Sequence, residues 1–97
     1  MAKPVFYIMT CSVPGVVKLG KTDTDKYDDE IKNLINNGYL NVFGWQEYRC
    51  RECDTEAEID AHLMSLEQYR WGSTELYMIG DPIFAILPYP RKPPFNM

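Results

Sequence analysis

The stretch VFYIMTCSVPGVVKLGKT, residues 5–22, decides the fold that the rest of the chain must complete. Residues 5–10 are β-branched and aromatic, which predicts a buried strand. Pro14 and Gly15 favour a tight turn, because proline restricts φ and glycine readily takes a positive φ. Residues 16–20 then predict a second strand that returns antiparallel to the first, so the stretch forms a β-hairpin.

Side chains on the second strand of this hairpin alternate between its two faces. Val17 and Leu19 share one face, whereas Val16 and Lys18 share the other. Gly20 ends the strand, which indicates a point where the backbone must come close to another group.

Helical and extended patterns alternate after the hairpin. Apolar residues at helical spacing begin after Lys26, and Asn36-Asn37-Gly38 stops the helix they predict. Residues 40–49 predict a third strand, which a bulge at Gly44 could interrupt. Short stretches complete the pattern: an extended segment at 75–79, a last helix at 83–87 and a proline-rich tail at 88–97.

A second helix is predicted from Thr55 to about Tyr69. Thr55 and Glu58 have the spacing of a capping box. The residues expected to face the core are Ala57, Ala61, Met64 and Leu66.

These patterns predict an α+β fold in one domain, residues 1–87, followed by an extended tail, residues 88–97. The expected architecture is a small mixed or antiparallel sheet, made of the hairpin and a third strand and flanked by about three helices. A chain of 97 residues can build one core, so functional side chains must share the scaffold that packs it.

Composition narrows the class of protein. No apolar run is as long as a membrane span, and the first residues do not resemble a signal peptide, so we expect an intracellular protein without membrane partners. Three cysteines, an odd number, favour reduced thiols over a disulfide framework. A formal net charge of −4 counts mildly against a protein that binds nucleic acid nonspecifically.

Motifs spread along the chain carry a resemblance to a known superfamily. The hairpin strands hold Phe6-Tyr7-Ile8 and Lys18-Leu19-Gly20, the latter followed by Lys21-Thr22. Glu58 and His62 then lie one helical turn apart, and Glu75 precedes an aromatic strand. In this order the motifs resemble the GIY-YIG nucleases, in particular the compact branch common in bacteriophages and large DNA viruses.

The resemblance implies a metal-dependent endonuclease that hydrolyses nucleic-acid phosphodiester bonds, with DNA favoured as the substrate. Glu75 would hold one Mg²⁺ or Mn²⁺, Tyr7 and His62 would handle the attacking water or its proton, and Lys18 would contact the phosphate. Lys21 would face the phosphate as well. Because no separate DNA-binding module is evident, a homodimer, a partner protein or a structured substrate would supply further affinity.

One feature of the family is missing from the sequence. Its active enzymes carry an arginine on the first helix that clamps the scissile phosphate, whereas KYDDEIKNLINN, residues 26–37, has none. Lys26 and Lys32 are the candidates to replace it, but a lysine cannot supply a planar bidentate fork. The alternative interpretation is therefore a catalytically degenerate module that binds nucleic acid or a protein partner without cleavage.

The cysteines offer a further alternative. Cys50 and Cys53 form a CxxC pair, and His62 could add a third zinc ligand, with Cys11 a fourth if the hairpin turn came near. The pattern stands alone, and most zinc sites of this kind require a second pair. A zinc-dependent regulatory domain is accordingly the weakest of the hypotheses.

Overall fold

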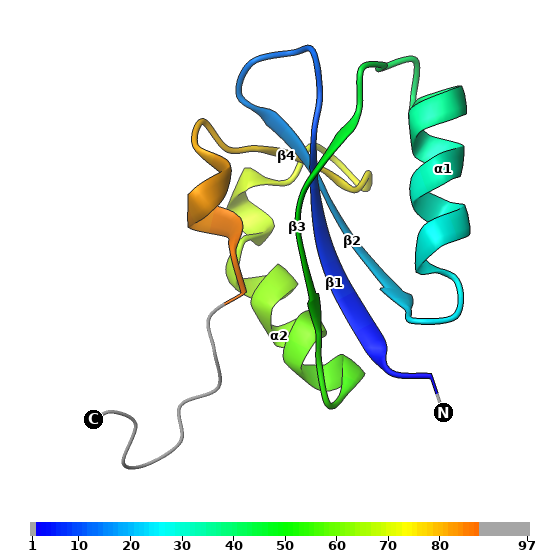
Figure 1. The fold of residues 1–97 in the computed structure, drawn as a ribbon. Coiled ribbons are helices and arrows are strands. Elements are labelled where there is room, and N and C mark those ends of the chain that lie inside the picture. The colour runs from blue at the N-terminus through cyan, green and yellow to red at the C-terminus, as the bar shows by residue number, and fades with distance from the viewer. Residues whose placement is uncertain (1, 88–97) are drawn as a thin grey trace.

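The computed structural model describes residues 2–87, and the predicted tail at 88–97 lies outside the described residues. Figure 1 shows a sheet with a helix packed on each side. The elements in chain order are β1 Pro4–Thr10, β2 Val16–Asp23, α1 Tyr27–Asn37, β3 Gln46–Glu52, α2 Glu56–Ser65, a 3₁₀ turn Glu67–Tyr69, β4 Leu76–Met78 and a second 3₁₀ turn Pro82–Ala85. The predicted α+β class is confirmed.

The sheet has the strand order β3-β1-β2-β4, and every neighbouring pair is antiparallel. The predicted hairpin is present, with Tyr7 opposite Gly20 and Met9 opposite Lys18. Directly opposed residues in an antiparallel pair share a face, so Tyr7, Gly20, Met9 and Lys18 all lie on one side of the sheet. This register fixes which side chains can meet.

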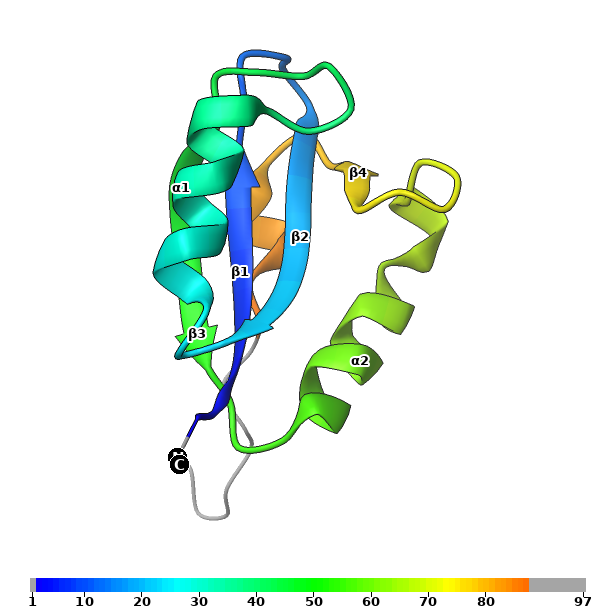
Figure 2. The same cartoon turned by 90° about the vertical axis from the view of Figure 1, so that its right-hand side faces the viewer.

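The two faces of the sheet form two separate cores. Helix α1 covers one face and α2 covers the other, as Figures 1 and 2 show together. We call these the α1 face and the α2 face. The buried residues of the α1 face are Tyr7, Met9, Ile31, Leu34, Trp45 and Leu76. Those of the α2 face are Phe6, Ile8, Val17, Leu19, Cys53, Ile59, Tyr77, Ile79, Ala85 and Leu87.

Several predicted elements needed correction. The third strand begins at Gln46 rather than residue 40, because residues 39–42 form a tight turn in which Tyr39 and Val42 exchange backbone hydrogen bonds. The bulge lies at the extra residue Tyr48, where the pairing of β1 with β3 shifts register, and not at Gly44. The predicted last helix is a 3₁₀ turn, so two α-helices flank the sheet instead of three.

Helix α2 keeps its predicted start, but it ends at Ser65 rather than near Tyr69, where a separate 3₁₀ turn follows, and it turns a different side to the core. Thr55 and Glu58 form the expected capping box. Ile59 is buried in the helix, with Leu63 packed against the same core, whereas Met64 is 76% exposed and Ala61 is exposed. No helix within residues 2–87 is both long and apolar enough to cross a membrane.

Candidate functional site

The candidate site is organised around Lys18, a lysine buried in the middle of β2. Its side chain is only 4% exposed. The ammonium donates to the Tyr7 hydroxyl at 2.7 Å and to Glu75 Oε1 at 2.5 Å. A buried ammonium requires partners of this kind, because leaving it unpaired would be costly. The structure therefore brings Tyr7, Lys18 and Glu75 together, three of the four residues that the sequence assigned to catalysis.

Tyr7 is fully buried, and its hydroxyl both accepts and donates a hydrogen bond. It accepts from Lys18 and donates to Glu30 Oε2 at 2.5 Å. Burial, and then the Glu30 carboxylate, raise the pKa of Tyr7 far above the ordinary value of a phenol. Tyr7 is consequently a neutral hydroxyl at neutral pH, and its oxygen is already engaged by Lys18.

Gly20 allows the tyrosine ring to lie where it does. A Cβ added at Gly20 would come within 2.1 Å of Tyr7 Cζ, a distance that no side chain tolerates. The glycine that closes the hairpin motif thus makes room for the ring across the strand. The predicted close approach at Gly20 is confirmed, but the strand does not end there, because β2 continues to Asp23.

Glu75 reaches the site from a turn that is bound together by hydrogen bonds. Arg70 Nε donates to the Thr74 carbonyl at 2.7 Å, and its Nη2 donates to the Ser73 carbonyl at 3.1 Å. The Glu75 carbonyl accepts from the backbone N–H of Leu19 at 3.1 Å, which attaches the turn to the edge of β2. The Glu75 side chain itself is 53% exposed, and it extends from this anchored turn to Lys18.

Tyr39 completes the enclosure of Lys18 from the loop after α1. Its hydroxyl accepts from the Glu75 N–H at 3.1 Å, and its ring centroid lies 5.1 Å from Lys18 Nζ. The turn that carries it has Leu40 at φ 50° and Asn41 at φ 64°. A positive φ is strained for a leucine, so tertiary contacts hold this turn in place.

His62 does not join this cluster. It lies on α2, where its ring packs edge-on to Phe6 with centroids 5.1 Å apart and its Nε2 bonds to the Ala85 carbonyl at 2.7 Å. Phe6 belongs to the α2 face, whereas Tyr7 belongs to the α1 face. The prediction that His62 lies beside Tyr7 is therefore wrong, because adjacent residues of β1 point to opposite sides of the sheet.

The predicted phosphate-binding lysines are dispersed. Lys21 Nζ lies 2.8 Å from Asp60 and 3.4 Å from Glu56 of α2. Lys26 is 77% exposed and lies 4.0 Å from Asp23, and Lys32 is exposed on α1. The side chain of α1 that hydrogen-bonds to Tyr7 is the carboxylate of Glu30, so a negative group lies where a basic clamp was expected.

Glu75 also lines a groove of about 380 Å³ on the α2 side of the sheet, together with Leu19, Tyr77 and side chains of α2. Lys21 and Arg70 contribute its cations, and Asp60, Glu67 and Glu75 contribute its anions. Lys21 is already paired with Asp60, and Arg70 Nη1 lies 3.2 Å from Glu67. The groove is thus a mixed rather than a basic surface.

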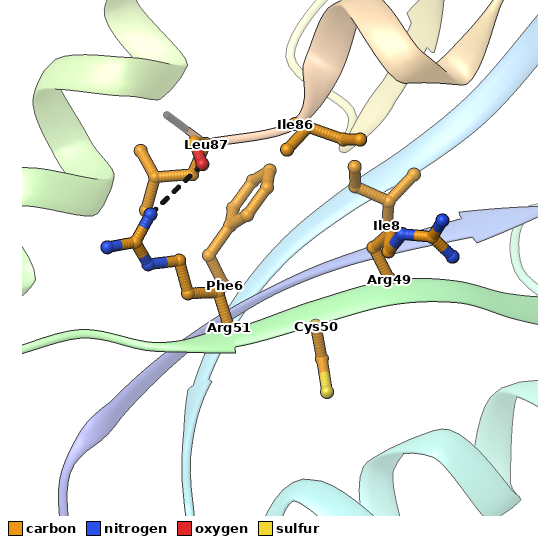
Figure 3. A pocket seen from close by; sticks show the side chains of 7 residues that line it. All are labelled: Phe6, Ile8, Arg49, Cys50, Arg51, Ile86 and Leu87. Atoms are coloured by element: carbon orange, nitrogen blue, oxygen red, sulfur yellow. Dashed lines mark hydrogen bonds between the residues drawn. The ribbon is translucent and has the colours of Figure 1, made fainter. Parts of the chain in front are cut away.

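The cysteines are not assembled into a metal site. Figure 3 shows Cys50 pointing away from a cavity of about 270 Å³ on the α2 face, which Arg49 and Arg51 flank. Cys53 is buried in the α2-face core, and Cys50 is opposite Tyr7 on β3. Across residues 2–87 no three His, Cys, Asp or Glu side chains form a group able to hold a metal ion. The sequence-based zinc hypothesis therefore has no assembled site in this region.

One divalent ion is still compatible with the cluster. Glu75 Oε1 is engaged by Lys18, but in the described part of the chain Oε2 makes no hydrogen bond, and the side chain is half exposed. Mg²⁺ keeps several waters and is commonly held by one or two carboxylates and substrate phosphates. The described residues offer such an ion one free carboxylate oxygen, that of Glu75, and its remaining ligands would have to come from outside the cluster.

Glu30, Tyr39 and Arg70 are the residues of this site that the sequence did not predict. Glu30 lies on the helix that directly follows the hairpin and Tyr39 lies in the loop after that helix, and no motif marks either residue. Arg70 stands five residues before Glu75, and its proximity was the one available signal.

No protein-family model, curated protein sequence or solved structure matches this chain.

Proposed function

We propose that this protein is a divalent-metal-dependent endonuclease that hydrolyses nucleic-acid phosphodiester bonds, with DNA as the favoured substrate. The observation that carries the proposal is the meeting of Tyr7, Lys18 and Glu75 within hydrogen-bond distance. These residues come from separate motifs, and a lysine beside a half-exposed carboxylate supplies charges of the kind that phosphodiester hydrolysis uses.

Each residue has a role that follows from its environment. When bound, an Mg²⁺ or Mn²⁺ ion held by Glu75 would neutralise charge on the phosphoryl group and lower the pKa of a coordinated water. The Lys18 ammonium serves as the point charge for a phosphoryl oxygen. Tyr7 positions Lys18 rather than taking a proton, because its hydroxyl is buried and its pKa is raised.

Binding of a long nucleic acid requires help beyond this cluster. The chain carries a formal net charge of −4, and the groove next to Glu75 holds both signs of charge. Electrostatic attraction to a phosphate backbone depends on local excess of cations. A second copy or a partner protein is therefore part of the proposal.

The test is cleavage of supercoiled and branched DNA with Mg²⁺ or Mn²⁺ by the wild type, Glu75→Ala and Glu67→Ala. Glu67 is an exposed acidic residue in the same groove, paired with Arg70, and serves as the matched control. Wild type and Glu67→Ala should cut, and Glu75→Ala should not. The enzyme proposal fails if the wild type cuts no better than Glu75→Ala.

A second candidate function is a module that binds nucleic acid or protein without cleavage. The observation that favours it is the hydrogen bond from Tyr7 to Glu30, because α1 presents a carboxylate there and carries Asp28 and Asp29 in the same first turn. Such a surface repels phosphate. Binding without cleavage in the same assay would support this function over the first.

A further inference from the structure

Within residues 2–87, the side chain of Lys18 is enclosed by Tyr7, Tyr39 and Glu75. Two of its three N–H donors point to Tyr7 and Glu75, and its ammonium lies 4.8 Å and 5.1 Å from the ring centroids of Tyr7 and Tyr39. With a side chain 4% exposed, it has no room for a further anion. Any external oxyanion that binds Lys18 must therefore displace one of its present partners.

Glu75 is the partner able to leave. Tyr7 is fully buried and its ring lies against Gly20, while Tyr39 is held by its own turn. The Glu75 carboxylate, by contrast, is half exposed, and within residues 2–87 its one hydrogen bond is to Lys18. Its backbone is fixed by bonds to Leu19 and Tyr39, so rotation of the side chain alone would open the site.

We propose that Lys18 forms a latent phosphate site and that Glu75 is its internal competitor. A carboxylate and a phosphate both present oxygen acceptors to an ammonium, so one replaces the other in the same place. This inference rests on the proposed function only for the source of the phosphate. The ligand chemistry is a phosphate group, whether free or part of a nucleic-acid backbone.

The competition couples cation binding to phosphate binding. A divalent cation that holds the Glu75 carboxylate removes the competitor from Lys18, and a phosphate on Lys18 releases Glu75 for the cation. Thermodynamic linkage requires the two effects to be equal. The resting ion pair thus weakens the binding of either ligand alone.

The experiment is titration calorimetry with EDTA present at constant ionic strength, using inorganic phosphate and a short single-stranded oligonucleotide as probes. Glu75→Gln should bind both probes about tenfold more tightly than the wild type, a typical size for coupling between sites. Glutamine keeps the shape and an oxygen acceptor for Lys18 but removes the competing charge. Glu67→Gln, which loses the same charge from the same groove, should bind like the wild type.

A second arm uses Ca²⁺ and the oligonucleotide. The wild type should bind the oligonucleotide more tightly when Ca²⁺ is present, and Glu75→Gln should not show this response to Ca²⁺. The double variant Lys18→Gln/Glu75→Gln should lose the tighter binding that Glu75→Gln alone gains. The inference is overturned if Glu67→Gln gains as much affinity for the probes as Glu75→Gln does. It is also overturned if Glu75→Gln folds but binds the probes no more tightly than the wild type. If Glu75→Gln does not fold, an absent Ca²⁺ response in the wild type overturns it.

The outcomes separate this inference from the proposed function. Tighter binding by Glu75→Gln in a protein that never cleaves DNA would leave the latent site standing and remove the nuclease. If the wild type cleaves DNA but Glu75→Gln binds phosphate like the wild type, the nuclease proposal stands and the latent site is ruled out. Tightening for free phosphate alone would identify the small anion, rather than nucleic acid, as the ligand.

Discussion

On the α1 face the sheet buries a lysine and a tyrosine hydroxyl joined to two carboxylates, whereas the buried residues of the α2 face are apolar apart from a thiol and one tyrosine. The two faces share the strands β1 and β2, so a single strand delivers Tyr7 to one face and Phe6 to the other. Polar groups that must be satisfied one by one constrain geometry far more than apolar packing does. The α1 face is therefore where substitutions should cost most.

The largest effect is expected from Gly20→Ala on the α1 face. Its new Cβ would collide with Tyr7 at 2.1 Å, and the ring cannot move without breaking its bonds to Lys18 and Glu30. We expect a loss of about 3 kcal/mol in the free energy of unfolding, measured by denaturant titration. Gly80→Ala is the control, since a Cβ there meets nothing within 4 Å. Equal stability of the two variants would contradict the packing described.

Replacing each lysine of β2 by alanine compares the faces directly. Lys18→Ala leaves a cavity and removes the partner of Tyr7, so it should cost about 2 to 3 kcal/mol. Lys21 pairs with exposed Asp60 and Glu56, and Lys21→Ala should cost less than about 1 kcal/mol. Thermal or denaturant unfolding of the two variants measures the difference. Similar losses of unfolding free energy in the two variants would mean that the burial of Lys18 adds nothing to the stability of the fold.

The hairpin and its faces were predictable because strand alternation needs no tertiary information. Gly20 was expected to mark a close approach, and Val17 and Lys18 were expected on opposite faces, as the structure has them. The alternation did not indicate, however, that Lys18 is buried. Its burial depends on Glu75 and Tyr39, two residues from distant loops, and no local pattern reports such a contact.

The position of His62 was not predictable for a different reason. Glu58 and His62 lie one turn apart as expected, but the side of the sheet on which α2 packs depends on the loop after β3 and on the apolar residues Ile59 and Leu63. The expected inward residues Ala61 and Met64 are exposed instead, so the helix is rotated relative to the prediction. A helix with alanines on one side gives a weak periodic signal.

Tyr7→Phe probes the hydroxyl of the α1 face without changing its volume. Lys18 and Glu30 would each lose a buried partner, at a cost of about 1 to 2 kcal/mol. Tyr27→Phe, whose hydroxyl bonds to exposed Glu47, should cost less than about 1 kcal/mol. Denaturant titration at neutral pH measures both. Comparable losses in the two variants would contradict the special position of Tyr7.

The same variant carries a prediction about pH. The pKa of Tyr7 is raised in the folded state above its value of 10.0 in the unfolded chain, so unfolding releases a proton at alkaline pH. The stability that this shift contributes is complete below pH 10 and is lost as the pH rises further. The stability of the wild type should therefore fall more steeply above pH 10 than that of Tyr7→Phe. Parallel curves would contradict the raised pKa.

The smallest effect is expected from His62→Gln, and it tests whether the α2 face takes part in function. Loss of the bond to the Ala85 carbonyl and of the ring contact with Phe6 should cost about 1 kcal/mol of stability. Because His62 packs on Phe6 of the α2 face whereas Lys18 bonds to Tyr7 of the α1 face, phosphate binding should not change. A selective loss of phosphate affinity at unchanged stability would instead place His62 in the site, and would require the two faces to communicate through β1, where Phe6 and Tyr7 are adjacent.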